Sequence, residues 1–298
     1  MTSYLPHGVT QELYPFTGKY LALKSGARLH YLDEGAGEPV VMLHGNPTWS
    51  FYFRNLVTAL RGTNRVIVPD HIGCGLSDKP GDDKYDYTLQ SRVDDLETLL
   101  DSLGVKENVT LVVHDWGGMI GFTYAARHPE RIKKLVVLNT GAFFLPDGKT
   151  FPAPLRLCRT PLGALLIRGF NAFARGAAWV GCKRARLSRD LRRAYAAPYS
   201  SWANRIATLR FVEDIPLAPG DKAYPVVAET QAKLPALAAV PMLICWGLRD
   251  FVFDRHFLAE WRRRFPAAEV HSFPDCGHYI LEDAKEEVIP LVKSFIEK

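Results

Sequence analysis

The chain has 298 residues, of which 47% are hydrophobic, and it carries a formal net charge of +5. This length suits one large domain with an insertion, and the small, scattered charge excess argues against nucleic-acid binding and for a small-molecule substrate. The five cysteines form no CxxC pair and no apolar run resembles an export signal or a transmembrane segment, so we expect a cytoplasmic protein without disulfides or a bound metal.

Short β-branched runs bounded by turn residues recur along the chain. The runs at residues 37–45, 64–70, 108–115, 133–140 and 240–247 are typical of buried strands, and a further strand is expected at residues 268–275. Stretches with the length and period of helices come between or after them, at residues 49–60, 88–103, 117–128, 257–264 and toward residue 298. This alternation predicts an α/β fold with a mostly parallel central sheet flanked by helices.

The alternation stops after Thr140 and resumes near residue 240. The intervening segment is rich in proline, arginine and aromatic residues. We therefore expect residues 1–142 and 226–298 to form the core domain, and residues 143–225 to form an inserted helical cap.

Asp115 lies where one predicted strand runs directly into a glycine-rich helix. In α/β hydrolases such a sharp strand-to-helix elbow holds an exposed nucleophile, usually serine. A carboxylate is ionised at neutral pH and attacks carbon to form an ester that must later be broken. By itself, an aspartate at this position is more often a helix N-cap. The nucleophile assignment rests on the partners that follow along the chain.

Those partners are Asp250 and His278, which follow the last two predicted strands. Each comes in a turn at a strand's carboxyl end, and the chain order of nucleophile, acid and histidine is that of α/β-hydrolase triads. His278 is the expected general base, and Asp250 is expected to orient it. Asp254 and Asp275 are nearby alternatives for the acid, but Asp250 follows its strand most directly.

Asn46 and Trp116 are the candidate groups for the leaving group and the oxyanion. Their backbone N–H groups are placed to form an oxyanion hole, while the Asn46 amide and the Trp116 indole N–H are donors suited to a departing anion. Singly, Asn46 has the alternative role of a turn residue and Trp116 that of a core residue. Their placement beside Asp115 favours the functional role.

Four motifs at these positions resemble the haloalkane dehalogenases, which have the α/β-hydrolase fold. They are HGNPTWSFYFR at 44–54, VPDHIGCGLSDKP at 68–80, VVHDWGGMIG at 112–121, and WGLRD with CGHYILED near the end. The resemblance implies cleavage of a carbon–halogen bond through an alkyl ester on Asp115, with halide held by Asn46 and Trp116 and no cofactor. Some members take the acid from the end of the strand before the cap. That position is Asn139 here, so the resemblance assigns the acid to Asp250.

The motifs PDHIGCGLSDKP and NTGAFFLP are also similar to those of the β-lactone decarboxylases of long-chain olefin biosynthesis, which we keep as the alternative to a dehalogenase. Epoxide hydrolases also use an aspartate nucleophile and activate the epoxide with cap tyrosines, for which Tyr195, Tyr199 and Tyr224 are available, although Asn46 argues against this reading. A non-catalytic receptor of the same fold is the alternative from another class. It is disfavoured because all three triad residues are present.

The predicted cap is strongly basic and amphipathic. Between Leu155 and Arg193 it holds ten basic residues and a single acidic one, Asp190. The first interpretation is a set of helices whose apolar face lines the pocket and whose arginines are solvated. The second is a surface that docks onto an acidic protein or a membrane. Either interpretation fits a hydrophobic substrate. The residues expected to form the pocket wall are Phe143, Phe144, Phe170, Phe173 and Trp179.

Overall fold

The computed structural model describes residues 5–298 and contains one eight-stranded sheet in the order β1-β2-β4-β3-β5-β6-β7-β8. Strands β3 to β8 run parallel, whereas β1 and β2 pair antiparallel with their neighbours. The strands are β1 (Lys19–Ala22), β2 (Arg28–Glu34), β3 (Pro39–Leu43), β4 (Arg65–Pro69), β5 (Val109–Asp115), β6 (Ile132–Thr140), β7 (Met242–Gly247) and β8 (Glu269–Phe273).

All six predicted strands are present as β3 to β8, and the predicted α/β-hydrolase fold is confirmed. The sequence analysis missed β1 and β2. Their residues mix charged and apolar side chains and form a hairpin at the edge of the sheet, which lacks the continuous apolar run of a strand covered on both faces.

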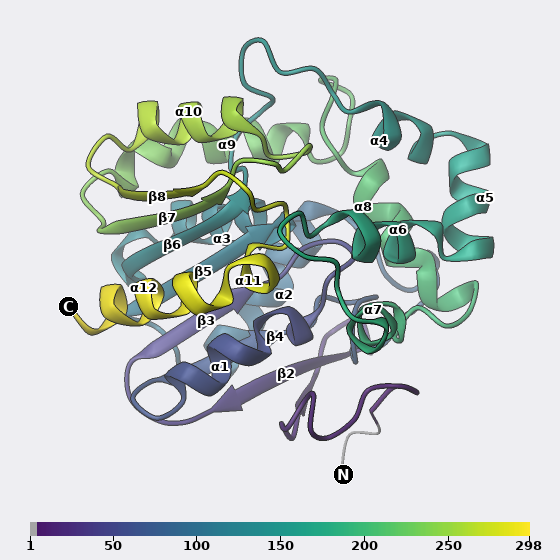
Figure 1. The fold of residues 1–298 in the computed structure, drawn as a ribbon, viewed down its shortest axis with the longest axis horizontal. Helices are drawn as coiled ribbons and strands as arrows, with labels where there is room; N and C mark the ends of the chain where they lie inside the picture. The colour runs from purple at the N-terminus through teal and green to yellow at the C-terminus, as the bar shows by residue number, and fades with distance from the viewer. Residues whose placement is uncertain (1–4) are drawn as a thin grey trace.

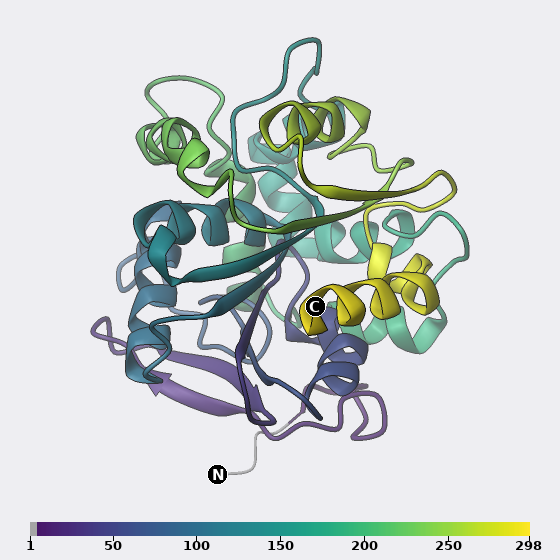
Figure 2. The same cartoon turned by 90° about the vertical axis from the view of Figure 1, so that its left-hand side faces the viewer.

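Helices cover both faces of the sheet (Figures 1 and 2). One face packs against α2, α3, α9 and α10, and the other against α1, α11 and α12, each over its own apolar cluster. The bounds are α1 (Arg54–Leu60), α2 (Leu89–Ser102), α3 (Trp116–Arg127), α9 (Tyr224–Lys233), α10 (Arg255–Arg264), α11 (Ile280–Asp283) and α12 (Lys285–Glu297). Thr88 begins α2 as its N-cap by accepting the backbone N–H of Ser91.

Five further helices follow β6 and lie beside the carboxyl ends of the strands, at the right of Figure 1. They are α4 (Ala153–Cys158), α5 (Pro161–Phe170), α6 (Ala172–Val180), α7 (Arg189–Ala196) and α8 (Ile206–Glu213). Helix α9 already packs against α3 of the core. The cap limits at residues 143 and 225 remain a prediction. Within residues 5–298, no helix is both long and apolar enough to cross a membrane.

Candidate active site

The elbow between β5 and α3 presents Asp115 at the carboxyl edge of the sheet. Its φ of +52° lies in a region that side chains rarely adopt, and close packing surrounds it. A Cβ atom on Gly117 would lie 1.9 Å from the carbonyl oxygen of Leu43, and one on Gly45 would lie 2.0 Å from Asp115 Oδ1. Glycine is therefore required at both positions for the backbone to approach this closely.

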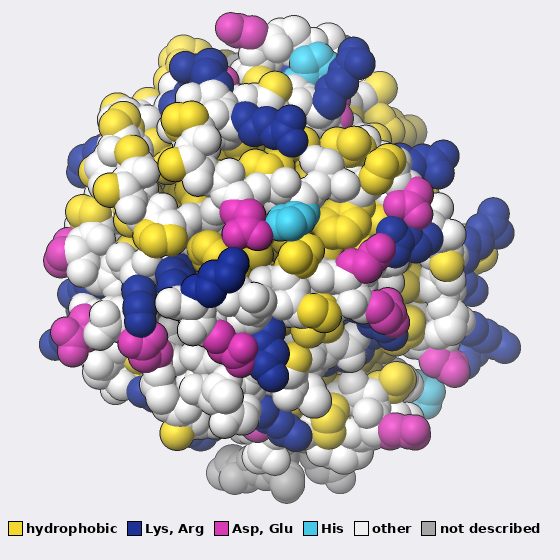
Figure 3. Space-filling model, turned by 60° about the vertical axis from the view of Figure 1, so that its left-hand side comes forward, with side chains coloured by type: hydrophobic (Ala, Val, Ile, Leu, Met, Phe, Trp, Pro, Cys, Tyr) yellow, Lys and Arg dark blue, Asp and Glu magenta, His cyan; other side chains and the backbone are white. Residues whose placement is uncertain are grey.

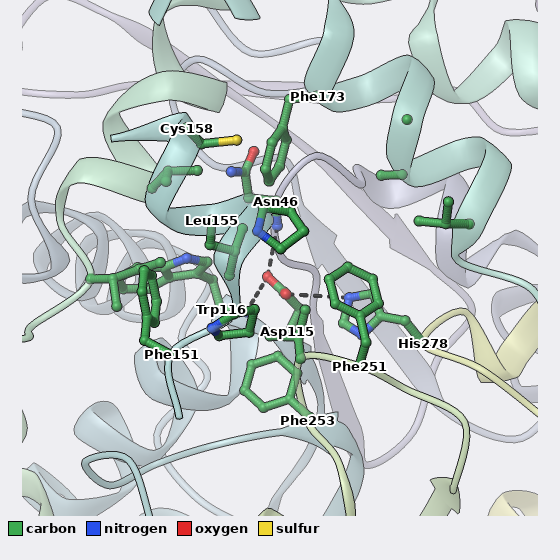
Figure 4. Close-up of a pocket in the computed structure, with 18 of the residues that line it drawn as sticks. Asn46, Asp115, Trp116, Phe151, Leu155, Cys158, Phe173, Phe251, Phe253 and His278 are labelled. Carbon is green, nitrogen blue, oxygen red and sulfur yellow. Dashed lines mark hydrogen bonds and ion pairs between the residues drawn. The ribbon is translucent and has the colours of Figure 1, made fainter. Parts of the chain in front are cut away.

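The two carboxylate oxygens of Asp115 have different surroundings (Figure 4). Oδ1 accepts the backbone N–H groups of Asn46 at 2.9 Å and Trp116 at 2.6 Å. Oδ2 lies 3.3 Å from Nε2 of His278. The backbone donors expected for an oxyanion hole therefore converge on one oxygen, and the other oxygen faces His278.

Asp250 is the acid that contacts His278. Its Oδ2 lies 2.7 Å from the Nδ1 of His278, and its Oδ1 accepts the backbone N–H of Val252 at 2.8 Å. Asn139 donates its amide to Oδ2 at 3.1 Å and also binds the backbone of Gly247. Asn139, the residue at the end of the strand before the cap, thus holds Asp250 in place.

The charges of this group favour an ion pair. Burial alone would lower the pKa of His278, but the charge of Asp250 and the hydrogen bonds to Asp115 and Asp250 raise it to about 10. Burial would likewise raise the pKa of Asp115, yet its hydrogen bond and charge interaction with His278 hold it below the ordinary carboxyl value. At neutral pH the resting site therefore holds an Asp115 carboxylate against a His278 imidazolium.

The side chains of Asn46 and Trp116 lie at the same end of the cavity (Figure 4). The Asn46 Nδ2 donates one hydrogen to the carbonyl of Thr208 in α8 at 3.0 Å, which orients the amide and leaves its second N–H free to reach a ligand. Among the described residues, the Trp116 indole Nε1 has no hydrogen-bond acceptor. Two uncharged donors are thus available beside the carboxylate.

A cavity of about 660 Å³ opens above Asp115 and is lined mostly by apolar side chains. Phe143, Phe144 and Phe173 line it, as expected. Phe170 and Trp179 do not, which corrects the expected pocket wall at these two positions. Their side chains are 63% and 52% exposed, because they lie on the outward faces of α5 and α6.

Other aromatic residues take their place in the wall, among them Phe151, Phe251 and Phe253 (Figure 4). The Phe253 ring stacks against His278 at 5.8 Å between centroids. These residues belong to irregular segments, where no periodicity in the sequence indicates which side chain points inward.

No tyrosine of the described residues lines this cavity. The Tyr195 hydroxyl binds Glu282, and the Tyr199 hydroxyl lies 3.4 Å from the carbonyl of Thr48. The Tyr224 ring packs against Phe144, with 4.5 Å between the ring centroids, and does not itself line the cavity. None of the three is placed to activate an epoxide in this pocket.

Asp283 is a further residue that the sequence analysis missed. Its buried carboxylate accepts the backbone N–H of Gly277 at 2.7 Å and those of Lys183 and Arg184 in the cap. It therefore ties the loop that carries His278 to the segment after α6. The only signal in the sequence is a short acidic pair after the CGH turn, which is also typical of a helix start.

The family model described as "alpha/beta hydrolase fold" matches residues 38–285. The chain belongs to the α/β-hydrolase-fold family. Three curated relatives of this α/β hydrolase are similar over nearly its whole length. A cis-3-alkyl-4-alkyloxetan-2-one decarboxylase of Shewanella oneidensis is 65% identical, covering 95% of this chain and 89% of the relative. A protein of the same name from Xanthomonas campestris is 52% identical, covering 97% and 99%.

The third relative is a haloalkane dehalogenase of Mycolicibacterium paratuberculosis, which is 34% identical over 95% of this chain and 94% of its own length. The resemblance found in the motifs is thus confirmed, as a closer similarity to the decarboxylases and a more distant one to the dehalogenases. All three relatives are named as enzymes, and this α/β hydrolase is an enzyme of the same family.

Proposed function

We propose that this α/β hydrolase is a decarboxylase of cis-3-alkyl-4-alkyl β-lactones that releases carbon dioxide and a cis-olefin. The observation that carries the proposal is the 65% and 52% identity with two relatives named for that reaction. Dehalogenation was the first expectation from the sequence, and its support is the 34% identity with a relative named haloalkane dehalogenase. Because both reactions can use a carboxylate nucleophile in an apolar pocket, the triad alone does not separate them.

The site suits a reaction in two steps on the lactone ring. Asp115 Oδ2 attacks C4, the bond from C4 to the ring oxygen breaks, and the released carboxylate stays attached to C3. The bond between C3 and that carboxylate then supplies the electrons of the new double bond, and Asp115 departs unchanged as carbon dioxide forms. Atoms and charge balance without water or a cofactor.

This sequence of steps also accounts for the geometry of the product. Attack inverts C4 and places the Asp115 oxygen opposite the carboxylate on C3. Elimination from that arrangement keeps the two alkyl groups on one side, so a cis-lactone yields a cis-olefin. No rotation about the bond between C3 and C4 is needed.

Each group in the site has a role in these steps. The free donors of Asn46 and Trp116 are suited to the carboxylate that leaves C4 in the first step. The His278 imidazolium, 3.3 Å from Oδ2, is suited to stabilise Asp115 as it regains its negative charge in the second. An apolar cavity of about 660 Å³ accommodates alkyl groups.

The test is product analysis in water enriched in oxygen-18. The enzyme is given a cis-dialkyl β-lactone or a 1-bromoalkane, olefin and halide are measured, and the Asp115 peptide is weighed after many turnovers. We expect olefin from the lactone and no heavy oxygen in Asp115, because water never attacks its ester. Halide release with labelled Asp115 would instead assign dehalogenation, and the absence of both products would reject both reactions.

The pH dependence of kcat/KM for olefin formation provides a second prediction. It should stay level through neutral pH, fall in acid as Asp115 is protonated below the ordinary carboxyl range, and fall above pH 10 or so as His278 loses its proton. Asp250→Asn should shift the alkaline fall to lower pH, because the carboxylate charge that raises the His278 pKa is gone. A rate that rises steadily toward pH 10 would show that neutral His278 is the active form.

A further inference from the structure

The outer surface of the cap exposes an unusual number of large apolar side chains. Helices α4, α5 and α6 lie at the edge of the molecule away from the sheet (Figure 1). Six large apolar side chains of these helices, together with Trp202 from the segment before α8, are between 43% and 63% exposed, and we call them the apolar cap surface: Leu157, Leu162, Leu165, Phe170, Trp179, Val180 and Trp202. Isolated exposed leucines are common, but a group of this size marks an interaction site.

The same surface is basic. Arg156, Arg175, Arg186 and Arg189 are exposed, and none pairs with a carboxylate of residues 5–298. The guanidinium of Arg192 lies 4.2 Å above the Trp179 ring. Arg168 lies 4.8 Å above that of Trp202. On the face turned toward the viewer in Figure 3, by contrast, basic and acidic side chains are interspersed.

The cavity lining includes exposed residues of this apolar region. Leu157 and Val180 belong both to the apolar cap surface and to the cavity lining, and the partly exposed Leu145 and Phe251 also line the cavity. Lys183, which is exposed, also lines the cavity. A hydrophobic molecule can therefore pass from the outer surface to Asp115 along apolar side chains.

We propose that the apolar cap surface rests on a phospholipid bilayer with anionic headgroups. Exposed leucine and aromatic side chains insert at the boundary of headgroups and acyl chains, while the surrounding arginines bind the phosphates. Tryptophan beneath a guanidinium is suited to this boundary because both groups combine an apolar body with a polar end. A long-chain substrate dissolved in the bilayer would then enter the cavity without crossing water.

Binding to vesicles tests this proposal in the absence of substrate. The full-length enzyme is sedimented with vesicles of phosphatidylcholine alone or with about one-third phosphatidylglycerol, at low and high salt. We expect binding to the anionic vesicles only, weakened by salt. Each arginine near the surface contributes about fivefold, so the variant Arg156→Gln/Arg175→Gln/Arg186→Gln/Arg189→Gln should bind at least tenfold more weakly.

The matched control removes four exposed basic charges from the surface of the core domain, outside the cap. This variant, Lys24→Gln/Lys106→Gln/Arg255→Gln/Arg262→Gln, should bind like the wild type. The variant Leu162→Ser/Phe170→Ser, which removes two mostly exposed apolar side chains, should also bind weakly and keep its thermal unfolding temperature. Equal binding by the arginine variant and the core control, or no vesicle binding by the wild type, would overturn the proposal. If the wild type does not bind vesicles, a protein remains as the candidate partner of the apolar cap surface.

The result of the vesicle-binding experiment does not depend on the proposed reaction. Asp115→Asn should bind vesicles as the wild type does, since Asp115 lies inside the cavity. A short-chain lactone dissolved in water should be converted equally by the wild type and the arginine variant, whereas a long-chain lactone held in anionic vesicles should be converted faster by the wild type. Equal rates on the vesicle-held lactone would contradict delivery from the membrane.

Discussion

Asp115→Asn should lower kcat/KM for olefin formation by at least about 10⁴-fold, because the amide cannot supply the negatively charged oxygen that attacks C4. The substitution preserves the shape of the side chain, and its carbonyl oxygen can still accept the backbone N–H groups of Asn46 and Trp116. The effect should therefore be confined to the chemical step. Steady-state olefin formation followed by gas chromatography measures it.

The fold of this variant is checked by thermal unfolding, which should match that of the wild type within a few degrees. Asp115→Ala provides a second variant that lacks any oxygen at this position. If either variant kept more than a small fraction of the wild-type rate, Asp115 would not be the nucleophile, and the lactone would have to open by another route.

His278→Ala should lower kcat by about 10³-fold, within the range expected when a group that stabilises a developing negative charge is removed. The imidazolium at 3.3 Å from Oδ2 is the only positive charge of the described residues that contacts the departing Asp115 carboxylate. Its loss should slow the second step more than the first. The covalent ester on Asp115 should then accumulate.

Mass spectrometry of His278→Ala after a single turnover tests this expectation. The protein should gain the mass of the whole lactone, because carbon dioxide leaves only in the second step, and the added mass should map to the peptide that contains Asp115. His256→Ala removes a histidine that lies outside the cavity lining and should leave turnover unchanged. A normal rate in His278→Ala, or an adduct on another residue, would rule out this role for His278.

Much of the fold and the order of the candidate triad could be predicted from local sequence. Strands β3 to β7 are largely apolar runs and were found as such, whereas the edge hairpin of β1 and β2, which mixes charged and apolar residues, was not. The positions of Asp115, Asp250 and His278 followed because each lies at the carboxyl end of a predicted strand or in the turn that follows it. The structure brings these three side chains together, and their catalytic roles remain proposals.

The choice between dehalogenation and decarboxylation could not be made from these motifs, since both chemistries can use the same carboxylate and the same donors. The relatives at 65% and 52% identity favour the alternative over the first expectation. There is also a physical reason why the motifs do not separate the two reactions. The reaction depends on which bond the bound substrate presents to Asp115, and that is a property of the pocket rather than of the triad.

The sequence by itself determined the α/β-hydrolase core, the elbow at Asp115 and the basic character of the cap, because each depends on residues close together in the chain. Only the tertiary structure decided that Asn139 holds Asp250, that Asp283 holds the loop of His278, and that Phe170 and Trp179 face outward. Helices α5 and α6 carry apolar residues on both faces. Periodicity cannot tell which face meets the cavity, since this depends on how segments distant in sequence pack together.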